Sequence, residues 1–156
     1  MFFGSVRHAV DDKGRVAIPP RFRYQLEEGG AMISRGADHC LVIYPGEEWR
    51  RLTEGIRYAA DAPPELREFL RAVFPSSQPL VADAQGRVRL TPDQRAWTGI
   101  ERTAVINGMN NVVEVFAEDR WDERQAALDP GQLGAMAARA RAAQSPPAGL
   151  GAEAGA

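Results

Sequence analysis

The stretch VDDKGRVAIPPRFR, residues 10–23, decides the fold because a related stretch, ADAQGRVRLTPDQR, occupies residues 82–95. Asp83 follows Asp11 by 72 residues, and the same offset relates the arginine that ends each turn and a tryptophan late in each unit. A fixed offset kept over this distance is the signature of an internal repeat. The sequence therefore predicts two copies of one structural unit.

Each copy has the pattern of a strand, a tight turn and a second strand. Residues 5–10 alternate apolar and polar side chains, as a half-buried strand does. In the turn that follows, Gly14 permits a positive φ, and an aspartate can hydrogen-bond the turn backbone. Val16 and Ile18 then face inward, which leaves Arg15 facing outward. The second copy repeats this pattern with Asp83, Gly86, Arg87, Val88 and Leu90.

The remaining elements follow from periodicity and from breaker residues. Further strands are expected at residues 31–34, 40–44, 78–82, 103–106 and 112–116. Helices are expected at residues 20–28, from Pro45 towards Ala60, at 65–74 and 92–97, and from Glu118 onward. A weak helix is expected around residues 133–140, and the tail 145–156 is expected to be disordered because it lacks bulky apolar residues.

These elements predict an α+β chain that is mainly β. One unit alone offers about four short strands and too little apolar surface to close a core. Two units paired around a pseudo-twofold axis would bury both sheets, so we expect a compact barrel of two interlocked halves. The expected parts are a first repeat with its linking helices (1–76), a second repeat (77–128) and a C-terminal tail (129–156).

Composition favours a soluble cytoplasmic protein of 156 residues, and the charge is unevenly distributed. No apolar run reaches the roughly 18 residues that a membrane span requires, so no membrane association is expected. Although the net charge is −2, residues 1–24 carry five basic and two acidic residues. By charge alone, an anion-binding face and an ordinary mixed surface are equally good interpretations.

The residue pattern of an enzyme is missing from the sequence. His39 and Cys40 would point to opposite faces of a strand, and Cys40 is interpreted as a small buried core residue. Trp49 and Trp121 are interpreted as packing between helix and sheet. We expect no cofactor, metal or small-molecule ligand.

Taken together, the duplicated turn motifs, the opening Met1–Gly4, and the segment Leu41–Pro45 with Trp49 resemble the MraZ family over about residues 1–125. The resemblance implies a tandem AbrB-like, swapped-hairpin barrel within one chain. It also implies a bacterial transcriptional regulator, with repression as the expected effect, that binds double-stranded DNA at promoter repeats of the division and cell-wall gene cluster, including its own promoter. A ring-shaped homo-oligomer associated with the nucleoid is implied as well.

Carried over by position, the DNA-binding residues would be Arg15 and Arg87, with Lys13 beside the first. Arginine can bind the O6/N7 edge of guanine bidentately, and lysine suits a phosphate. Arg7 and Arg89 form a second set of expected contacts. The turn-forming and orienting residues would be Asp11, Gly14, Asp83 and Gly86.

Two alternatives remain open at this point. The arginines could serve as structural ion pairs with the aspartates of their turns, and this role is compatible with DNA binding. The chain could also be an antitoxin-like interaction module that neutralises a partner protein through residues 129–156. The two copies also differ in charge, and the first copy is the more basic.

Overall fold

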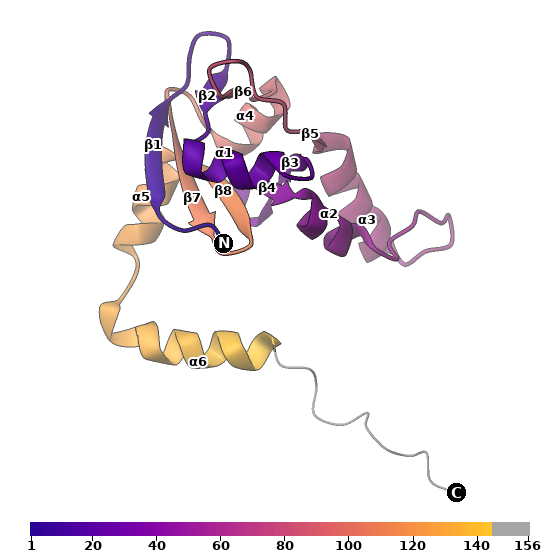
Figure 1. Cartoon of the computed structure of the whole chain (residues 1–156). Coiled ribbons are helices and arrows are strands. Elements are labelled where there is room, and N and C mark those ends of the chain that lie inside the picture. Colours follow the sequence, from indigo (N-terminus) through magenta and orange to yellow (C-terminus); the bar gives the residue numbers. More distant parts are fainter. Residues whose placement is uncertain (145–156) are drawn as a thin grey trace, which may run out of the picture. The chain divides into compact units, whose positions relative to one another are not determined.

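Two antiparallel sheets organise residues 1–123 in the computed structural model, which describes residues 1–144 (Figure 1). The six-stranded sheet has the order β1 (Ser5–Ala9), β7 (Thr103–Met109), β8 (Val112–Ala117), β4 (Leu41–Pro45), β3 (Ala31–Arg35) and β5 (Gln78–Pro79). The two-stranded sheet consists of β2 (Arg15–Ala17) and β6 (Arg87–Arg89). The α+β class expected from the sequence is therefore confirmed.

The expected closed barrel is not formed by the strands of residues 1–144. The central six-stranded sheet is open, and β2 and β6 pair with each other as a separate short ribbon. Pro19 and Pro92 follow closely after the two ribbon strands, and proline has no N–H group with which to extend a ladder. Each ribbon strand is three residues long, and the N–H groups that follow, of Ile18 and Leu90, donate to the turn residues Gly86 and Gly14 of the other copy.

The strand registers reveal a pseudo-twofold axis between the two copies. In the ribbon, Val16 lies opposite Val88, and in the large sheet Val42 lies opposite Glu114. The members of each pair are 72 residues apart, so the axis passes through both pairs. Crosswise backbone hydrogen bonds obey the same symmetry: the N–H of Ile18 donates to the carbonyl of Gly86 (3.0 Å), and that of Leu90 donates to the carbonyl of Gly14 (2.9 Å).

One pair of strands departs from the common offset. Ala31 on β3 pairs with Pro45, whereas Ala104 on β7 pairs with Ala117, so these strands are related by 73 residues. A one-residue shift would turn a strand's apolar face to the opposite side. The second copy has one more residue than the first before this strand, and the 73-residue offset accommodates it. Ala31 and Ala104 therefore keep equivalent positions, and both lie in the core.

Five helices accompany the sheets in residues 1–126: α1 (Pro20–Glu27), α2 (Gly46–Thr53), α3 (Pro64–Val73), α4 (Pro92–Thr98) and α5 (Glu118–Ala126). Within residues 1–144, three short 3-10 turns occur, at η1 (Ala37–His39), η2 (Phe74–Ser76) and η3 (Pro130–Gln132). The expected extension of α2 towards Ala60 is wrong, because the chain becomes extended at Glu54 (ψ 126°) and Gly55 follows with a φ of 74°. The expected strand at 78–82 shortens to the two residues of β5.

The aromatic residues expected to pack helix against sheet do so in both copies. The rings of Tyr44 and Trp49 lie 5.6 Å apart, and those of Phe116 and Trp121 lie 5.5 Å apart. Cys40 is buried, as expected, and its thiol donates to the carbonyl of Ala37. These contacts fix α2 and α5 on the strands that precede them.

The segment from Arg124 onward forms a second unit by itself. It contains α6 (Leu133–Gln144), which confirms the helix expected around residues 133–140. The tail 145–156, expected to be disordered, lies outside the described residues. Within residues 1–144, helices long and apolar enough to cross a bilayer are absent.

Candidate nucleic-acid interface

The first turn is built by a single aspartate side chain. Asp11 Oδ1 accepts hydrogen bonds from the backbone N–H groups of Lys13 (2.9 Å) and Arg15 (2.8 Å). Its backbone N–H also donates to the carbonyl of Arg15 at 2.9 Å. Gly14 adopts a φ of 75°, a value that a residue with a Cβ rarely takes. These contacts present Arg15 at the start of β2.

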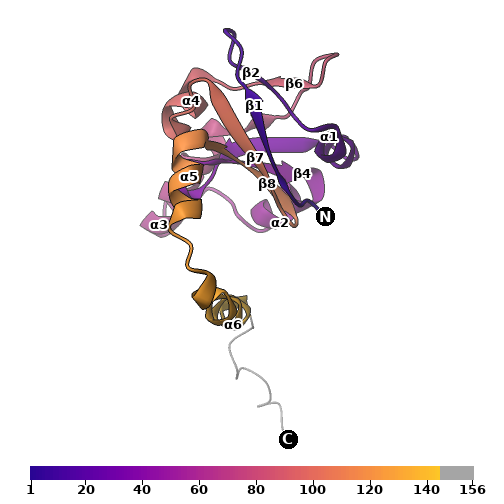
Figure 2. The ribbon, with the colours of Figure 1, turned by 90° about the vertical axis from the view of Figure 1, so that its left-hand side faces the viewer.

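The second turn repeats this geometry. Asp83 Oδ1 accepts from the N–H groups of Gln85 and Arg87, both at 2.9 Å. Gly86 also has a φ of 75°. The structure therefore places Asp11, Gly14, Asp83 and Gly86 in turn-forming positions. Figure 2 shows both turns at the same end of the 1–123 unit, beside the ribbon β2–β6.

Four charged side chains link the two turns. Nε of Arg15 lies 2.7 Å from Oδ2 of Asp11, and Nε of Arg87 lies 2.9 Å from Oδ2 of Asp83. Each arginine also approaches the aspartate of the other turn, at 3.9 Å for Arg15 and 3.6 Å for Arg87. Both arginine side chains are 29% exposed. The ion pairs expected as an alternative are therefore present, and they hold both guanidinium groups at a partly exposed surface.

Hydrogen bonds within the turns lower the pKa values of both aspartates. Hydrogen bonding from the backbone N–H of Arg15, followed by that from its side chain, lowers the pKa of Asp11 below 3.8. The equivalent donors of Arg87 lower the pKa of Asp83 in the same way. Both carboxylates are therefore ionised at neutral pH and neutralise part of the arginine charge.

Two further arginines hold the turns crosswise, and no role had been assigned to them from the sequence. Arg95 in α4 packs on the first turn, where a Cβ added to Gly14 would lie 3.6 Å from its Cδ. Arg23 in α1 packs on Gly86 in the second turn. The sequence does contain a sign that these two arginines have equivalent roles, since Arg23 and Arg95 are themselves 72 residues apart. Each copy thus supports the turn of the other.

The outer cations differ in their surroundings. Lys13 and Arg89 are exposed, and their side chains make no hydrogen bond or ion pair with residues 1–144. Arg7 instead lies on β1 and binds α5, through Glu118 at 2.8 Å and Asp122 at 2.6 Å. The hydrogen bonds that Arg7 donates to these carboxylates, the one to Asp122 foremost, raise the pKa of Arg7. The structure therefore groups Lys13 and Arg89 with the ribbon and places Arg7 apart from it.

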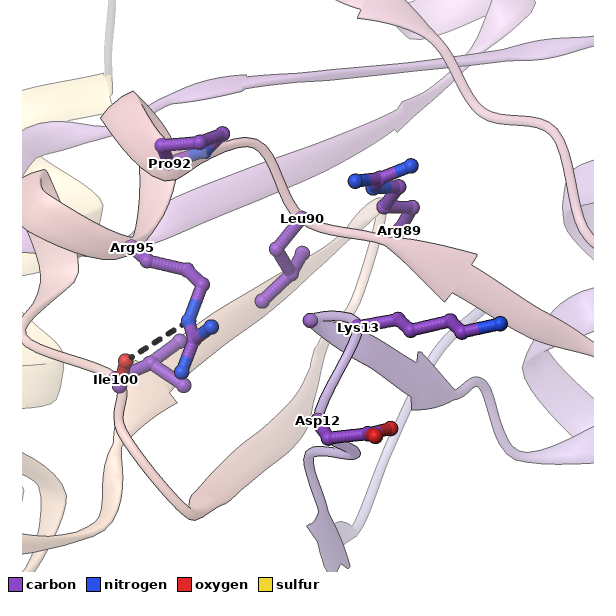
Figure 3. A pocket seen from close by; sticks show the side chains of 8 residues that line it. Asp12, Lys13, Arg89, Leu90, Pro92, Arg95 and Ile100 are labelled. Atoms are coloured by element: carbon purple, nitrogen blue, oxygen red, sulfur yellow. Dashed lines mark hydrogen bonds between the residues drawn. The ribbon is translucent and has the colours of Figure 1, made fainter.

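A shallow cavity of about 470 Å³ lies beside the first turn. Its lining comprises Asp12, Lys13, Gly14, Arg89, Leu90, Pro92, Arg95 and Ile100, of which three are basic and one is acidic (Figure 3). Within residues 1–144, no group of three His, Cys, Asp or Glu side chains could hold a metal ion. The charged side chains that line this cavity are mainly basic.

The fold and this surface define a protein made of two copies of one unit, which presents paired arginine turns at a pseudo-twofold axis. A family model described as "MraZ protein, putative antitoxin-like" matches residues 1–71. The chain is 40% identical to "Transcriptional regulator MraZ" of Thermomicrobium roseum over 78% of this chain and 84% of that protein. For the protein of the same name from Parafrankia sp., the identity is 41%, over 78% and 85% of the two chains.

A third relative, "Transcriptional regulator MraZ" of Herpetosiphon aurantiacus, is 39% identical over 83% of this chain and 87% of its own length. The chain therefore belongs to the MraZ family. Members of this family are named as regulators of transcription, and the chain is not an enzyme.

Proposed function

We propose that this protein is a sequence-specific DNA-binding transcriptional regulator. The observation that carries the proposal is the pair of Asp–Arg turns, which are joined by ion pairs and present Arg15 and Arg87 together at a partly exposed surface. The names of the relatives support the same function. The protein acts in the cytoplasm at the nucleoid, where it represses the division and cell-wall gene cluster, including its own promoter.

Arg15 and Arg87 contact base edges in this proposal. Each uses Nε for the aspartate of its own turn, and its Nη1 lies 3.6–3.9 Å from the aspartate of the other turn, beyond hydrogen-bond distance. The terminal nitrogens can therefore donate to the O6/N7 edge of guanine. Asp11 and Asp83 act as positioning residues, because they fix the guanidinium planes before DNA arrives. A group held in its binding orientation loses less conformational entropy on binding.

The outer cations contact the phosphate backbone. Lys13 and Arg89 are free to do so, whereas Arg7 would have to exchange the carboxylates of Glu118 and Asp122 for a phosphate. Phosphate contacts fix the position of a protein on the duplex and make its affinity depend on salt. Lys13 and Arg89 are therefore expected to contribute more to the salt dependence than Arg7.

The two repeats, 1–76 and 77–128, are proposed to interlock as swapped hairpins of the AbrB-like type. The pairing of β2 with β6 and the crosswise hydrogen bonds of Ile18 and Leu90 support this arrangement. Several such chains, assembled as a ring-shaped homo-oligomer, would engage tandem promoter repeats at once. Linked weak contacts then become a strong one, because each further contact is intramolecular.

A second candidate function is an antitoxin-like interaction with another protein. The description of the family model favours it, and Leu133 and Met136 of α6 are exposed. An exposed apolar helix face can dock in the groove of a partner. Co-purification of a second protein in stoichiometric amount would favour this candidate over DNA binding.

Footprinting on the DNA upstream of the protein's own gene tests the main proposal. The expected result is protection of short repeated sites, spaced regularly, by nanomolar to micromolar protein. Uniform weak protection of any duplex, equal to that of an unrelated DNA of the same length, would overturn the claim of sequence specificity.

A further inference from the structure

Arg95 of α4 connects the first turn to the loop that precedes β7. Its Nη2 donates to the carbonyl of Glu101 at 2.9 Å, and its Nε donates to that of Ile100 at 3.4 Å (Figure 3). The guanidinium group is held there against the turn, since a Cβ added to Gly14 would lie 3.6 Å from both its Cδ and its Nη1. Two of the donors of Arg95 are therefore directed at the protein.

Arg23 of α1 takes the equivalent place at the second turn. A Cβ added to Gly86 would overlap Nη1 of Arg23, so the turn accepts this arginine only because residue 86 is a glycine. Nε of Arg23 lies 3.7 Å from a carboxylate oxygen of Glu27 on the same helix. The side chain is thus held between its own helix and the turn of the other copy.

The two glycines receive backbone contacts from the opposite copy as well. The carbonyl of Gly14 accepts the N–H of Leu90, and that of Gly86 accepts the N–H of Ile18. Both glycines are buried, although they lie in turns. Because each glycine directly precedes the arginine of its turn, the opposite copy fixes the peptide from which that arginine extends.

Base recognition depends on the position of this peptide. An arginine that binds the O6/N7 edge of guanine must align two donors with the base, and such a site needs its groups within about 0.5 Å of the productive geometry. Asp11 fixes the guanidinium group of Arg15 relative to its own turn. The place of that turn relative to the rest of the surface depends on contacts with the opposite copy, and Arg95 supplies one of them.

We propose that Arg23 and Arg95 are positioning residues for sequence-specific DNA binding, and that they act crosswise. Arg95 sets the position of Arg15, and Arg23 sets that of Arg87. The inference rests on the proposed DNA-binding function. In this arrangement neither copy alone holds its turn in the orientation for a base contact, so specific binding is a property of the two interlocked copies.

Charge-preserving substitutions separate positioning from phosphate binding. Lysine keeps the charge and can contact a phosphate, but it lacks the planar group that donates to two carbonyls at once. Arg95→Lys and Arg23→Lys should therefore weaken binding to a duplex that the wild type protects in its upstream DNA, by about three- to tenfold. Binding to an unrelated duplex of the same length should be unchanged. Arg71→Lys, on the exposed surface of α3, is the matched control and should bind both duplexes as the wild type does.

Two results would overturn the positioning role at this stage. One is wild-type affinity of Arg95→Lys and Arg23→Lys for the upstream duplex. The other is the pattern of a phosphate contact, in which the glutamine variants Arg95→Gln and Arg23→Gln weaken binding to both duplexes and lower the slope of log affinity against log salt by about 0.9 each, while the lysine variants bind normally.

Double-mutant cycles test the crosswise action. If Arg95 acts through Arg15, Arg95→Lys should cost little further affinity in an Arg15→Ala background and its full amount in an Arg87→Ala background. The opposite pattern is expected for Arg23→Lys. Such cycles separate coupled residues from independent ones. Equal costs in the two backgrounds would indicate a general loss of structure and overturn the proposal, as would coupling of each arginine to the turn of its own copy.

The outcomes also distinguish this inference from the proposed function. A wild-type protein that protects no site in its upstream DNA overturns both. A protein that loses specific affinity on Arg15→Ala, yet keeps wild-type affinity on Arg95→Lys and Arg23→Lys, retains its proposed function and loses only the positioning residues.

Discussion

Truncation of the two valines on the pseudo-twofold axis tests whether the two copies form one core. Val16 and Val88 face each other in the ribbon and are 1% and 2% exposed. Changing valine to alanine removes two buried carbons, at about 0.8 kcal/mol per methylene, and leaves a small cavity. Val16→Ala and Val88→Ala should therefore each lower the free energy of unfolding by about 2–3 kcal/mol. The symmetry of their surroundings predicts nearly equal losses.

Urea unfolding followed by circular dichroism measures these losses, and Val81→Ala is the matched control. Val81 is 74% exposed, so the same chemical change there should alter the free energy of unfolding by no more than about 0.5 kcal/mol. The double variant should depart from additivity by about 0.5 kcal/mol or more, because the two side chains share one site. A large loss for one valine beside a negligible loss for the other would refute the shared core.

Three further predictions concern the cap, the turns and Arg7. Thr91→Ala removes the capping box that joins Thr91 to Gln94 and should lower the free energy of unfolding by about 1 kcal/mol, whereas Thr91→Ser should preserve it; thermal melts that do not separate the two variants would contradict this. The pKa values of Asp11 and Asp83 are lowered in the folded protein, so their contribution to stability is present above pH 3.8 and is lost as the pH falls through the lower folded values. In unfolding titrations from about pH 5 downward, the double variant Asp11→Asn/Asp83→Asn should therefore lose less free energy of unfolding than the wild type. Arg7→Ala should change the salt dependence of DNA binding less than Lys13→Gln does, and an equal change would show that Arg7 leaves its acidic partners for phosphate.

Local chemistry made the two turns predictable. An aspartate, a glycine and an arginine at fixed spacing specify a turn whose backbone needs a side-chain acceptor and a positive φ, and both occur at Asp11 and Gly14. The alternation after each turn identified Val16 and Val88 as core residues. The fixed offset then indicated that the second turn repeats the first.

Features that depend on distant contacts could not be predicted in the same way. The ion pairs between the turns exist only because β2 pairs with β6, and the sequence leaves open which strand each one meets. Arg7 finds its acidic partners 111 and 115 residues away, on α5. The extra residue before β7 cannot be recognised from the sequence alone. It is identified only from the strand registers, in which Ala31 and Ala104 occupy equivalent positions.

The expected closed barrel is wrong because β2 and β6 pair with each other as a separate ribbon and the six-stranded sheet is open. The helices expected at residues 20–28 and 92–97, shortly after the two ribbon strands, are confirmed by α1 and α4. The ribbon is short because each of its strands starts directly after one turn and faces the other turn at its end. Gly55, which has a positive φ two residues after the end of α2, indicates an earlier end of this helix than the expected extension towards Ala60.

The central claim, that Arg15 and Arg87 bind DNA, is tested most directly by the affinity of the two alanine variants for the upstream DNA. Fluorescence anisotropy at fixed salt measures the affinity, and size-exclusion chromatography shows whether the assembly is intact. Each substitution should cost about 1–3 kcal/mol of specific binding, with Arg15→Ala costing more than Arg87→Ala, and the double variant should lose specific binding while keeping the wild-type assembly. Specific binding by the double variant with wild-type affinity would contradict the account.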